Sequence, residues 1–135
     1  MDVRQLRKLI LYWLPPLFWM IIIFYLSSRM SVKVTGTLLY DFLIFKGLHM
    51  IEYAFLYFLL FRAFFSIENK NITLKQKLIF PLIISLFYAL SDEIHQTFVP
   101  TREGKIRDVI IDSFGIVLMY IYIKSNLKLV KRFLP

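Results

Sequence analysis

The sequence contains no cysteine. This absence excludes disulfide bonds and thiolate chemistry, and it leaves the redox compartment undefined by the sequence. The 135 residues also lack internal repeats, low-complexity tracts and any stretch typical of a domain linker. A chain of this length without an internal boundary predicts a single domain over residues 1–135.

Charged residues are few beside the apolar ones. Hydrophobic residues make up 59% of the chain and the mean hydropathy is +0.64, whereas soluble domains are about 45–50% apolar. The aromatic share is 18%, and Tyr and Trp are well suited to the interfaces of a bilayer. The composition therefore indicates a membrane protein whose main partner is the lipid bilayer.

The formal net charge of +8 raises the alternative of nucleic-acid binding. The basic residues, however, flank the apolar runs, and neither a basic face nor a motif of interleaved aromatic and basic residues is present. We therefore expect no nucleic-acid partner.

Four apolar runs have the length of a helix, at residues 9–26, 42–65, 78–96 and 106–123. About 20 apolar residues are needed to cross about 30 Å of hydrocarbon as a helix. None of the runs shows the alternation of a barrel strand, and in lipid a helix satisfies its backbone groups within one segment. The predicted fold is all-α, a polytopic bundle of four transmembrane helices.

The first run also has features of a signal peptide, because basic residues precede its apolar core. Its length favours a membrane span, as does the absence of a small-x-small cleavage pattern in Ser27-Ser28-Arg29-Met30. Pro15 and Pro16 are expected to start or kink this helix, since a proline nitrogen has no hydrogen to donate and is tolerated in a first turn.

The distribution of basic residues predicts the orientation. With four spans, 11 Lys and Arg residues lie on the side of the two termini, and 6, including Lys33, lie on the other side. Because basic excess marks the cytoplasmic side, we expect both termini to be cytoplasmic, in a multi-pass protein of the bacterial cytoplasmic membrane.

Polar side chains recur at helical spacing near one end of the last three runs. The three stripes are Lys46, His49, Glu52 and Tyr53; Ser85, Tyr88, Asp92, His95 and Gln96; and Asp108, Asp112, Gly115 and Met119. A charged side chain costs about 2.5–3.5 kcal/mol at the bilayer centre, so these groups should face one another rather than lipid. The spacing therefore predicts a polar pocket open to the outside, with Gly115 allowing close helix approach.

Several segments carry a resemblance to a known family. They are Phe24-Tyr25-Leu26-Ser27-Ser28, Leu48-His49-Met50-Ile51-Glu52-Tyr53, Ser91-Asp92-Glu93-Ile94-His95-Gln96 with the following Pro100-Thr101-Arg102, and Asp108 to Gly115. Over about residues 17–120 the chain resembles the VanZ-like family of small bacterial membrane proteins. It departs from the family at Thr101, where the family usually has Gly. The family is named for a protein linked to low-level resistance to the glycopeptide teicoplanin, and the resemblance implies no established biochemical activity.

We expect an outward-facing pocket that binds an envelope-related molecule, lipid-linked or peptidoglycan-related, and so modulates glycopeptide susceptibility. The candidate residues, called here the polar cluster, are His49, Glu52, Asp92, Glu93, His95, Gln96, Arg102, Asp108 and Asp112. Two alternatives remain open: a metal-dependent or acid-base membrane enzyme acting on an envelope lipid, and a small proton-coupled transporter. Neither Ser91 nor Ser113 has a base partner evident in the sequence, so no nucleophile is predicted. The sequence predicts no oligomeric state.

Two pairs in the polar cluster have the spacing of metal-binding motifs. His49 with Glu52, and Asp92 with His95, are three residues apart, as are carboxylate–histidine ligands of a divalent metal in helix bundles. The alternative is a network of hydrogen bonds and ion pairs that only keeps the helices in register.

The arginines have two interpretations. Arg102 and Arg107 could hold a lipid or cell-wall phosphate through paired hydrogen bonds. Alternatively they pair with Glu93, Glu103 or Asp108, and for Arg107 the structural pairing is favoured.

Overall fold

The computed structural model describes residues 3–29, 37–102 and 104–134, and these residues form helices and no strand. Its elements are α1 (Val3–Lys8), the π-helical turn η1 (Leu9–Trp13), α2 (Leu14–Ser27), α3 (Leu38–Phe65), α4 (Leu74–Gln96), α5 (Ile106–Ser125), α6 (Leu127–Val130) and the 3-10 turn η2 (Lys131–Phe133). The prediction of an all-α fold is confirmed.

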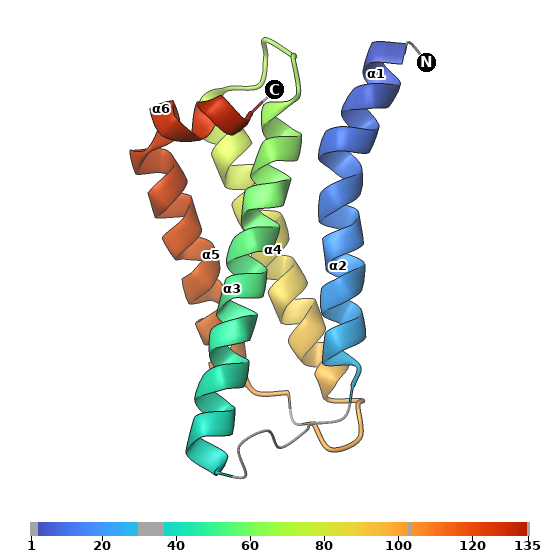
Figure 1. Cartoon of the computed structure of the whole chain (residues 1–135), viewed down its shortest axis with the longest axis vertical. Coiled ribbons are helices and arrows are strands. Elements are labelled where there is room, and N and C mark those ends of the chain that lie inside the picture. Colours follow the sequence, from blue (N-terminus) through green and yellow to red (C-terminus); the bar gives the residue numbers. More distant parts are fainter. Residues whose placement is uncertain (1–2, 30–36, 103, 135) are drawn as a thin grey trace.

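The long helices stand side by side, and α6 lies across one end of the bundle (Figure 1). The first helix, the α3–α4 connection and the C-terminal segment reach that same end, whereas residues 97–102 lie at the other end (Figure 1). Lys33, which entered the count of basic residues, lies outside the described residues.

The helices extend beyond the apolar runs from which they were predicted. The first begins at Val3 and continues through η1 into α2, so the prolines do not start it. Pro15 and Pro16 lie instead in the first turn of α2, directly after the π-helical turn, where the missing N–H groups are tolerated. Helix α4 begins at Leu74 because Thr73 caps it: Gln76 N donates to Thr73 Oγ1 at 3.2 Å, and Thr73 N donates to Gln76 Oε1 at 2.8 Å.

Three helical segments are long and apolar enough to cross a membrane, namely Val3–Ser27, Leu43–Phe65 and Leu74–Gln96. Helix α5 has 20 residues, a spanning length, but it includes Arg107, Asp108, Asp112 and Lys124 and is less apolar. Its acidic residues are buried inside the bundle, which removes them from lipid.

The core lies between α3, α4 and α5. Tyr53, Tyr57 and Phe61 of α3 are fully buried, together with Ile116 and Ile123 of α5. Gly115 allows α5 to approach α3 closely, because a Cβ atom there would overlap the backbone oxygen of Met50. The close approach predicted from Gly115 is therefore confirmed.

Candidate functional site

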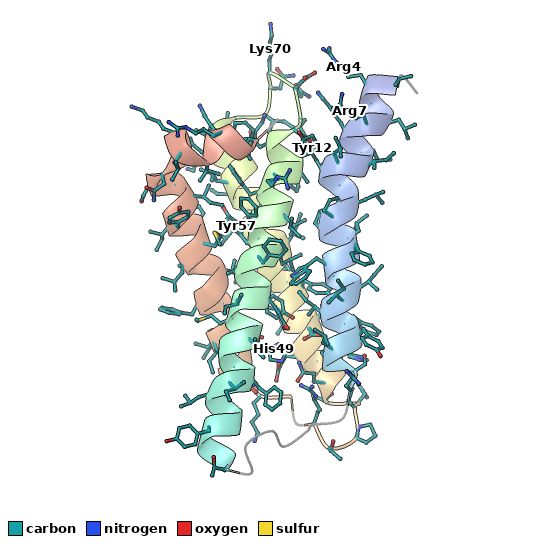
Figure 2. All side chains as sticks on the ribbon, in the orientation of Figure 1. Arg4, Arg7, Tyr12, His49, Tyr57 and Lys70 are labelled. Atoms are coloured by element: carbon teal, nitrogen blue, oxygen red, sulfur yellow. The ribbon has the colours of Figure 1, made fainter. Side chains whose placement is uncertain are left out.

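All the buried ionisable side chains, among the described residues and apart from tyrosines, belong to the polar cluster. They are His49, Asp92, Glu93, Asp108 and Asp112, each at most 9% exposed. They come from the first half of α3, the last turns of α4 and the first half of α5. Figure 2 shows His49 well separated from Arg4, Arg7 and Lys70, which lie at the opposite end of the bundle. Helical spacing therefore brings the three stripes together as expected.

Asp92 joins α4 to the end of α2. Its Oδ1 accepts a hydrogen bond from Ser27 Oγ at 2.6 Å, and its Oδ2 accepts one from Gln96 Nε2 at 3.1 Å. All three side chains are buried, with Ser27 fully so. A buried carboxylate is tolerated when hydrogen bonds satisfy it, and Asp92 has a donor for each oxygen.

Glu93 holds the start of α5. Its Oε1 accepts a hydrogen bond from the backbone N–H of Lys105 at 2.7 Å, one residue before the helix begins. A carboxylate at a helix N-terminus satisfies an otherwise unpaired N–H and interacts favourably with the helix dipole. Gly104 allows this approach, because a Cβ atom there would overlap the backbone oxygen of Glu93 and the side chain of Thr97.

Asp108 forms the closest ion pair in the cluster. Its Oδ2 lies 2.6 Å from Lys46 Nζ of α3, and its Oδ1 lies 3.4 Å from Arg107 Nε. The structural pairing favoured for Arg107 is therefore present. The pair places a cation of α3 against an anion of α5 at a largely buried position, where both charges are neutralised locally.

His49 and Glu52 form a second pair, as their spacing predicts. Nδ1 of His49 lies 3.1 Å from Oε2 of Glu52, within ion-pair distance, although neither atom makes a hydrogen bond of good geometry. Both side chains line a cavity of about 270 Å³, together with Leu26, Arg29, Phe45, Leu48 and Arg102. We call this cavity the α2–α3 pocket.

Arg102 binds the end of α2 rather than a carboxylate of the described chain. Its Nε donates to the backbone oxygen of Arg29 at 2.8 Å, its Nη2 to that of Leu26 at 3.3 Å, and its Nη1 to Gln96 Oε1 at 3.5 Å. The partners considered from the sequence, Glu93 and Asp108, are bound elsewhere, and Glu103 lies outside the described residues. The positive guanidinium interacts favourably with the carbonyl groups at a helix C-terminus.

His95 turns towards the end of α2. Its Nε2 lies 3.0 Å from Ser28 Oγ, and its ring lies 4.4 Å from the ring of Phe24, both residues being at the end of α2. Among the described residues, no three His, Asp or Glu side chains are placed to hold a metal ion. The two carboxylate–histidine pairs proposed as ligands therefore do not form one centre.

Asp112 is the least exposed side chain of the cluster, at 2%. Its Oδ1 has no hydrogen-bond partner in the described part of the chain, and neither have the buried hydroxyls of Tyr53 and Ser85. An unsatisfied buried polar group costs about 1–3 kcal/mol. The cluster thus contains groups that reduce stability as well as groups that support it.

Sequence reasoning missed the contribution of the first helix. Ser27 and Ser28 bind Asp92 and the His95 ring, and Arg29 adds a second guanidinium to the α2–α3 pocket. A signal was available: Ser27-Ser28 is part of the resemblance, and Arg29 follows directly at the end of an apolar run.

Apolar helices around a buried ionisable cluster define a small polytopic helical membrane protein. A family model described as VanZ/LLP1 matches residues 9–129, most of the chain, so the protein belongs to the VanZ-like family. At family level it is thereby linked to glycopeptide resistance. No curated protein and no solved structure matches the chain significantly.

Proposed function

We propose that the α2–α3 pocket binds the anionic headgroup of a lipid-linked envelope molecule and that this binding modulates glycopeptide susceptibility. The observation that carries the proposal is the pocket lining, which combines two arginines, His49 and Glu52 with the apolar Leu26, Phe45 and Leu48. Guanidinium groups match phosphate oxygens, and the apolar wall suits the first carbons of a lipid chain.

The remaining residues of the polar cluster hold the helix ends around this pocket. Asp92 and Gln96 fix the end of α2, and Glu93 fixes the start of α5. Asp108 neutralises the ammonium group of Lys46, and Asp112 places a second carboxyl group of α5 inside the bundle. His95 packs against Phe24. Their role is to hold the arginines and the His49–Glu52 pair in place around the ligand.

We place the pocket at the outer face of the bacterial cytoplasmic membrane, in a single domain with both termini in the cytoplasm. The excess of basic residues on the side of the termini supports this orientation. A ligand in the outer leaflet would then have direct access to Arg29 and Arg102.

The test combines binding with a growth phenotype. Arg29→Gln and His49→Ala are expressed in a teicoplanin-sensitive host, and the purified proteins are tested for retention of a lipid-linked peptidoglycan precursor. Lys75→Gln, an exposed cation at the opposite end of the bundle, is the matched control. Loss of retention and phenotype at unchanged membrane abundance supports the pocket, whereas unchanged retention contradicts it. Loss of abundance in both pocket variants would make the cluster structural only.

The geometry favours an acid-base enzyme acting on such a lipid as the second candidate. A carboxylate 3.1 Å from an imidazole nitrogen can orient the ring and stabilise its protonated form, and both groups line the pocket. If the wild type slowly converts the bound lipid, and if Glu52→Gln loses this conversion but still binds the lipid, then the protein is an acid-base enzyme rather than a binding protein. The metal-dependent version and the transporter gain no such support, since the buried acidic and histidine side chains of the described residues all lie at one end of the bundle and no three of them are placed to hold a metal ion.

A further inference from the structure

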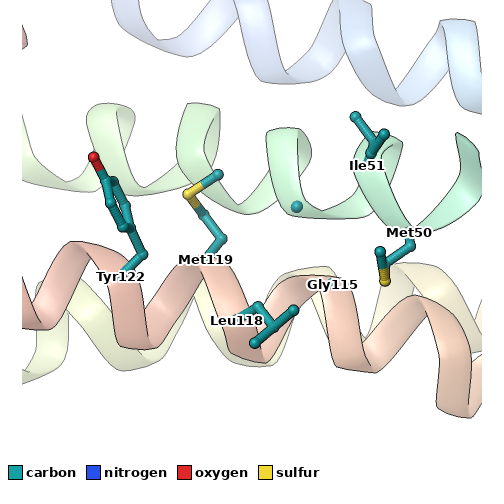
Figure 3. A pocket seen from close by; sticks show the side chains of 7 residues that line it. Met50, Ile51, Gly115, Leu118, Met119 and Tyr122 are labelled. Carbon is teal, nitrogen blue, oxygen red and sulfur yellow. The ribbon is translucent and has the colours of Figure 1, made fainter. Parts of the chain in front are cut away.

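A groove runs between α3 and α5 and shares no lining residue with the α2–α3 pocket. The part of the groove farther from α6 is a cavity of about 210 Å³ with small side chains at Ala54 and Gly115 and flexible ones at Met50 and Met119. Figure 3 shows Gly115, Leu118, Met119 and Tyr122 in that order along α5, with Met50 on the neighbouring α3 beside Gly115. Nearly all of the surface that lines this cavity is apolar.

The groove continues towards α6. A second cavity of about 300 Å³ is lined by Phe58, Tyr122, Leu129 and Val130, so the two cavities share Tyr122. On α3 the lining residues Met50, Ala54 and Phe58 are four residues apart and lie on one face. We call the whole feature the α3–α5 groove.

The dimensions of the groove suit a flexible chain better than a helix. A helix with its side chains is about 10–12 Å wide, whereas α3 and α5 are already in backbone contact at Met50 and Gly115. A second helix therefore cannot enter between them. An acyl chain can, because it needs only a shallow apolar channel with side chains that adjust to it, as methionines do.

The charge at one end of the groove selects the headgroup. Leu129 and Val130 belong to α6, and the neighbouring Lys128, Lys131 and Arg132 are exposed. Basic side chains at a membrane surface attract anionic lipid headgroups. A second copy docked in parallel against this face would bring two sets of these cations together, which is unfavourable.

We propose that the α3–α5 groove binds one anionic phospholipid, with an acyl chain along Ala54 and Tyr122 and the phosphate against Lys128 and Lys131. This site is independent of the α2–α3 pocket and of its proposed ligand. Bound there, the lipid fills the space between α3 and α5 and fixes α6 across the end of the bundle.

Native mass spectrometry of the full chain, released from nanodiscs of equal parts phosphatidylglycerol and phosphatidylcholine, tests the proposal. The wild type is expected to retain one phosphatidylglycerol. Ala54→Phe, which fills the groove, should abolish this retention. The double variant Lys128→Gln, Lys131→Gln should weaken it about 30-fold if each cation contributes as a surface lysine does.

Two matched controls accompany these variants. Ile83→Phe adds bulk at an exposed apolar position of α4, and the double variant Lys70→Gln, Lys75→Gln removes the same charge from other exposed positions. Both should retain the lipid as the wild type does. If Ala54→Phe does not fold, Leu118→Phe narrows the same cavity.

Three results would overturn the proposal. The wild type retains both lipids equally, the groove-filling variant retains phosphatidylglycerol undiminished, or the released protein is a lipid-free dimer that Ala54→Phe converts to a monomer. The last result would assign this face to a second copy of the chain. None of them bears on the α2–α3 pocket, whose test uses a different lipid and different variants.

Discussion

Helices α2 and α5 both lie against α3, but different interactions hold them there. Helix α5 packs with its backbone against α3 at Gly115 and buries Ile116 and Ile123 completely. Helix α2 buries only Pro16, Ile23 and Ser27.

Hydrogen bonds compensate for the sparse packing of α2. Trp19 Nε1 donates to the backbone oxygen of Glu52 at 3.0 Å, Tyr88 Oη donates to that of Met20 at 2.6 Å, and Ser27 bonds to Asp92. Lipid tails provide no hydrophobic force between helices, so packing and hydrogen bonds decide their association. Helices α3, α4 and α5 therefore form the closely packed part of the bundle, and the position of α2 depends on groups of the polar cluster.

The largest effect is expected from a substitution that disturbs the packing of α5 against α3. Gly115→Ala should destabilise the protein by about 3 kcal/mol, because the added methyl group meets the backbone of Met50, which cannot rotate away. Gly47→Ala is the matched control: its Cβ meets nothing within 4 Å, so it should be neutral or stabilise α3 by about 0.5–1 kcal/mol. Thermal unfolding in detergent measures both, and equal unfolding temperatures would show that α3 and α5 are not closely packed.

The ion pair between α3 and α5 should have the next largest effect. Lys46→Met leaves Asp108 buried with only the more distant Arg107, at a cost of about 2 kcal/mol. Adding Asp108→Asn should recover part of that loss, since the unpaired charge is then gone. Chemical unfolding of the single and double variants measures the difference. If the double variant lost more unfolding free energy than the two single variants together, the pairing would be contradicted.

A smaller effect is expected for the bond that holds α2. In a double-mutant cycle of Ser27→Ala and Asp92→Asn, the coupling should be about 1 kcal/mol, in the range of interhelical hydrogen bonds in membranes. Because the chain has no cysteine, Ile23→Cys provides a unique label that is fully buried when α2 is in place. Ser27→Ala should speed maleimide labelling there without exposing Ile116→Cys. Equal labelling at both positions would mean that the bundle opens as a whole.

The sequence predicted the helices and their meeting point for a simple physical reason. Apolar runs of spanning length must be helical in lipid, and a period of 3.6 residues places Asp108, Asp112 and Gly115 on one face. The predicted helix ends were wrong because hydropathy indicates only the segments expected in lipid. The first helix begins earlier, in the mainly polar segment from Arg4 to Lys8 that precedes the apolar run.

The partners within the cluster could not be predicted in the same way. Asp92 and His95 share a face of α4, yet each also binds a serine at the end of α2, more than 60 residues away in the sequence. Glu93 likewise bonds to the backbone N–H of Lys105 rather than to a charged side chain. Backbone donors and carbonyls leave no signature in a sequence, so the bonds of Glu93 and Arg102 required coordinates.

Backbone strain in the connection from α4 to α5 predicts a substitution that stabilises the protein modestly, unlike those above. Thr101 has φ = 67°, a left-handed conformation that is costly for a β-branched residue and free of that cost for glycine. Thr101→Gly should therefore stabilise the protein by about 1 kcal/mol, after the entropy that glycine loses on folding. Thermal unfolding measures the gain, and the Ile23→Cys label should react as slowly as before, because Arg102 still holds the end of α2. Destabilisation by this change would mean that the Thr101 side chain itself matters.

The smallest effect is expected at the other end of the first helix, where Lys8 Nζ lies 2.5 Å from Glu68 Oε1. The ammonium group lowers the pKa of Glu68 below its ordinary value of 4.5. Its stabilising contribution is therefore present at neutral pH and is lost as the pH falls through the lowered pKa. Since Glu68 is fully exposed, solvent and salt screen the pair, and Glu68→Gln should leave the unfolding temperature unchanged at pH 7. A decrease in unfolding temperature as large as that of Ser27→Ala would mean that the first helix is held at its basic end rather than by the polar cluster.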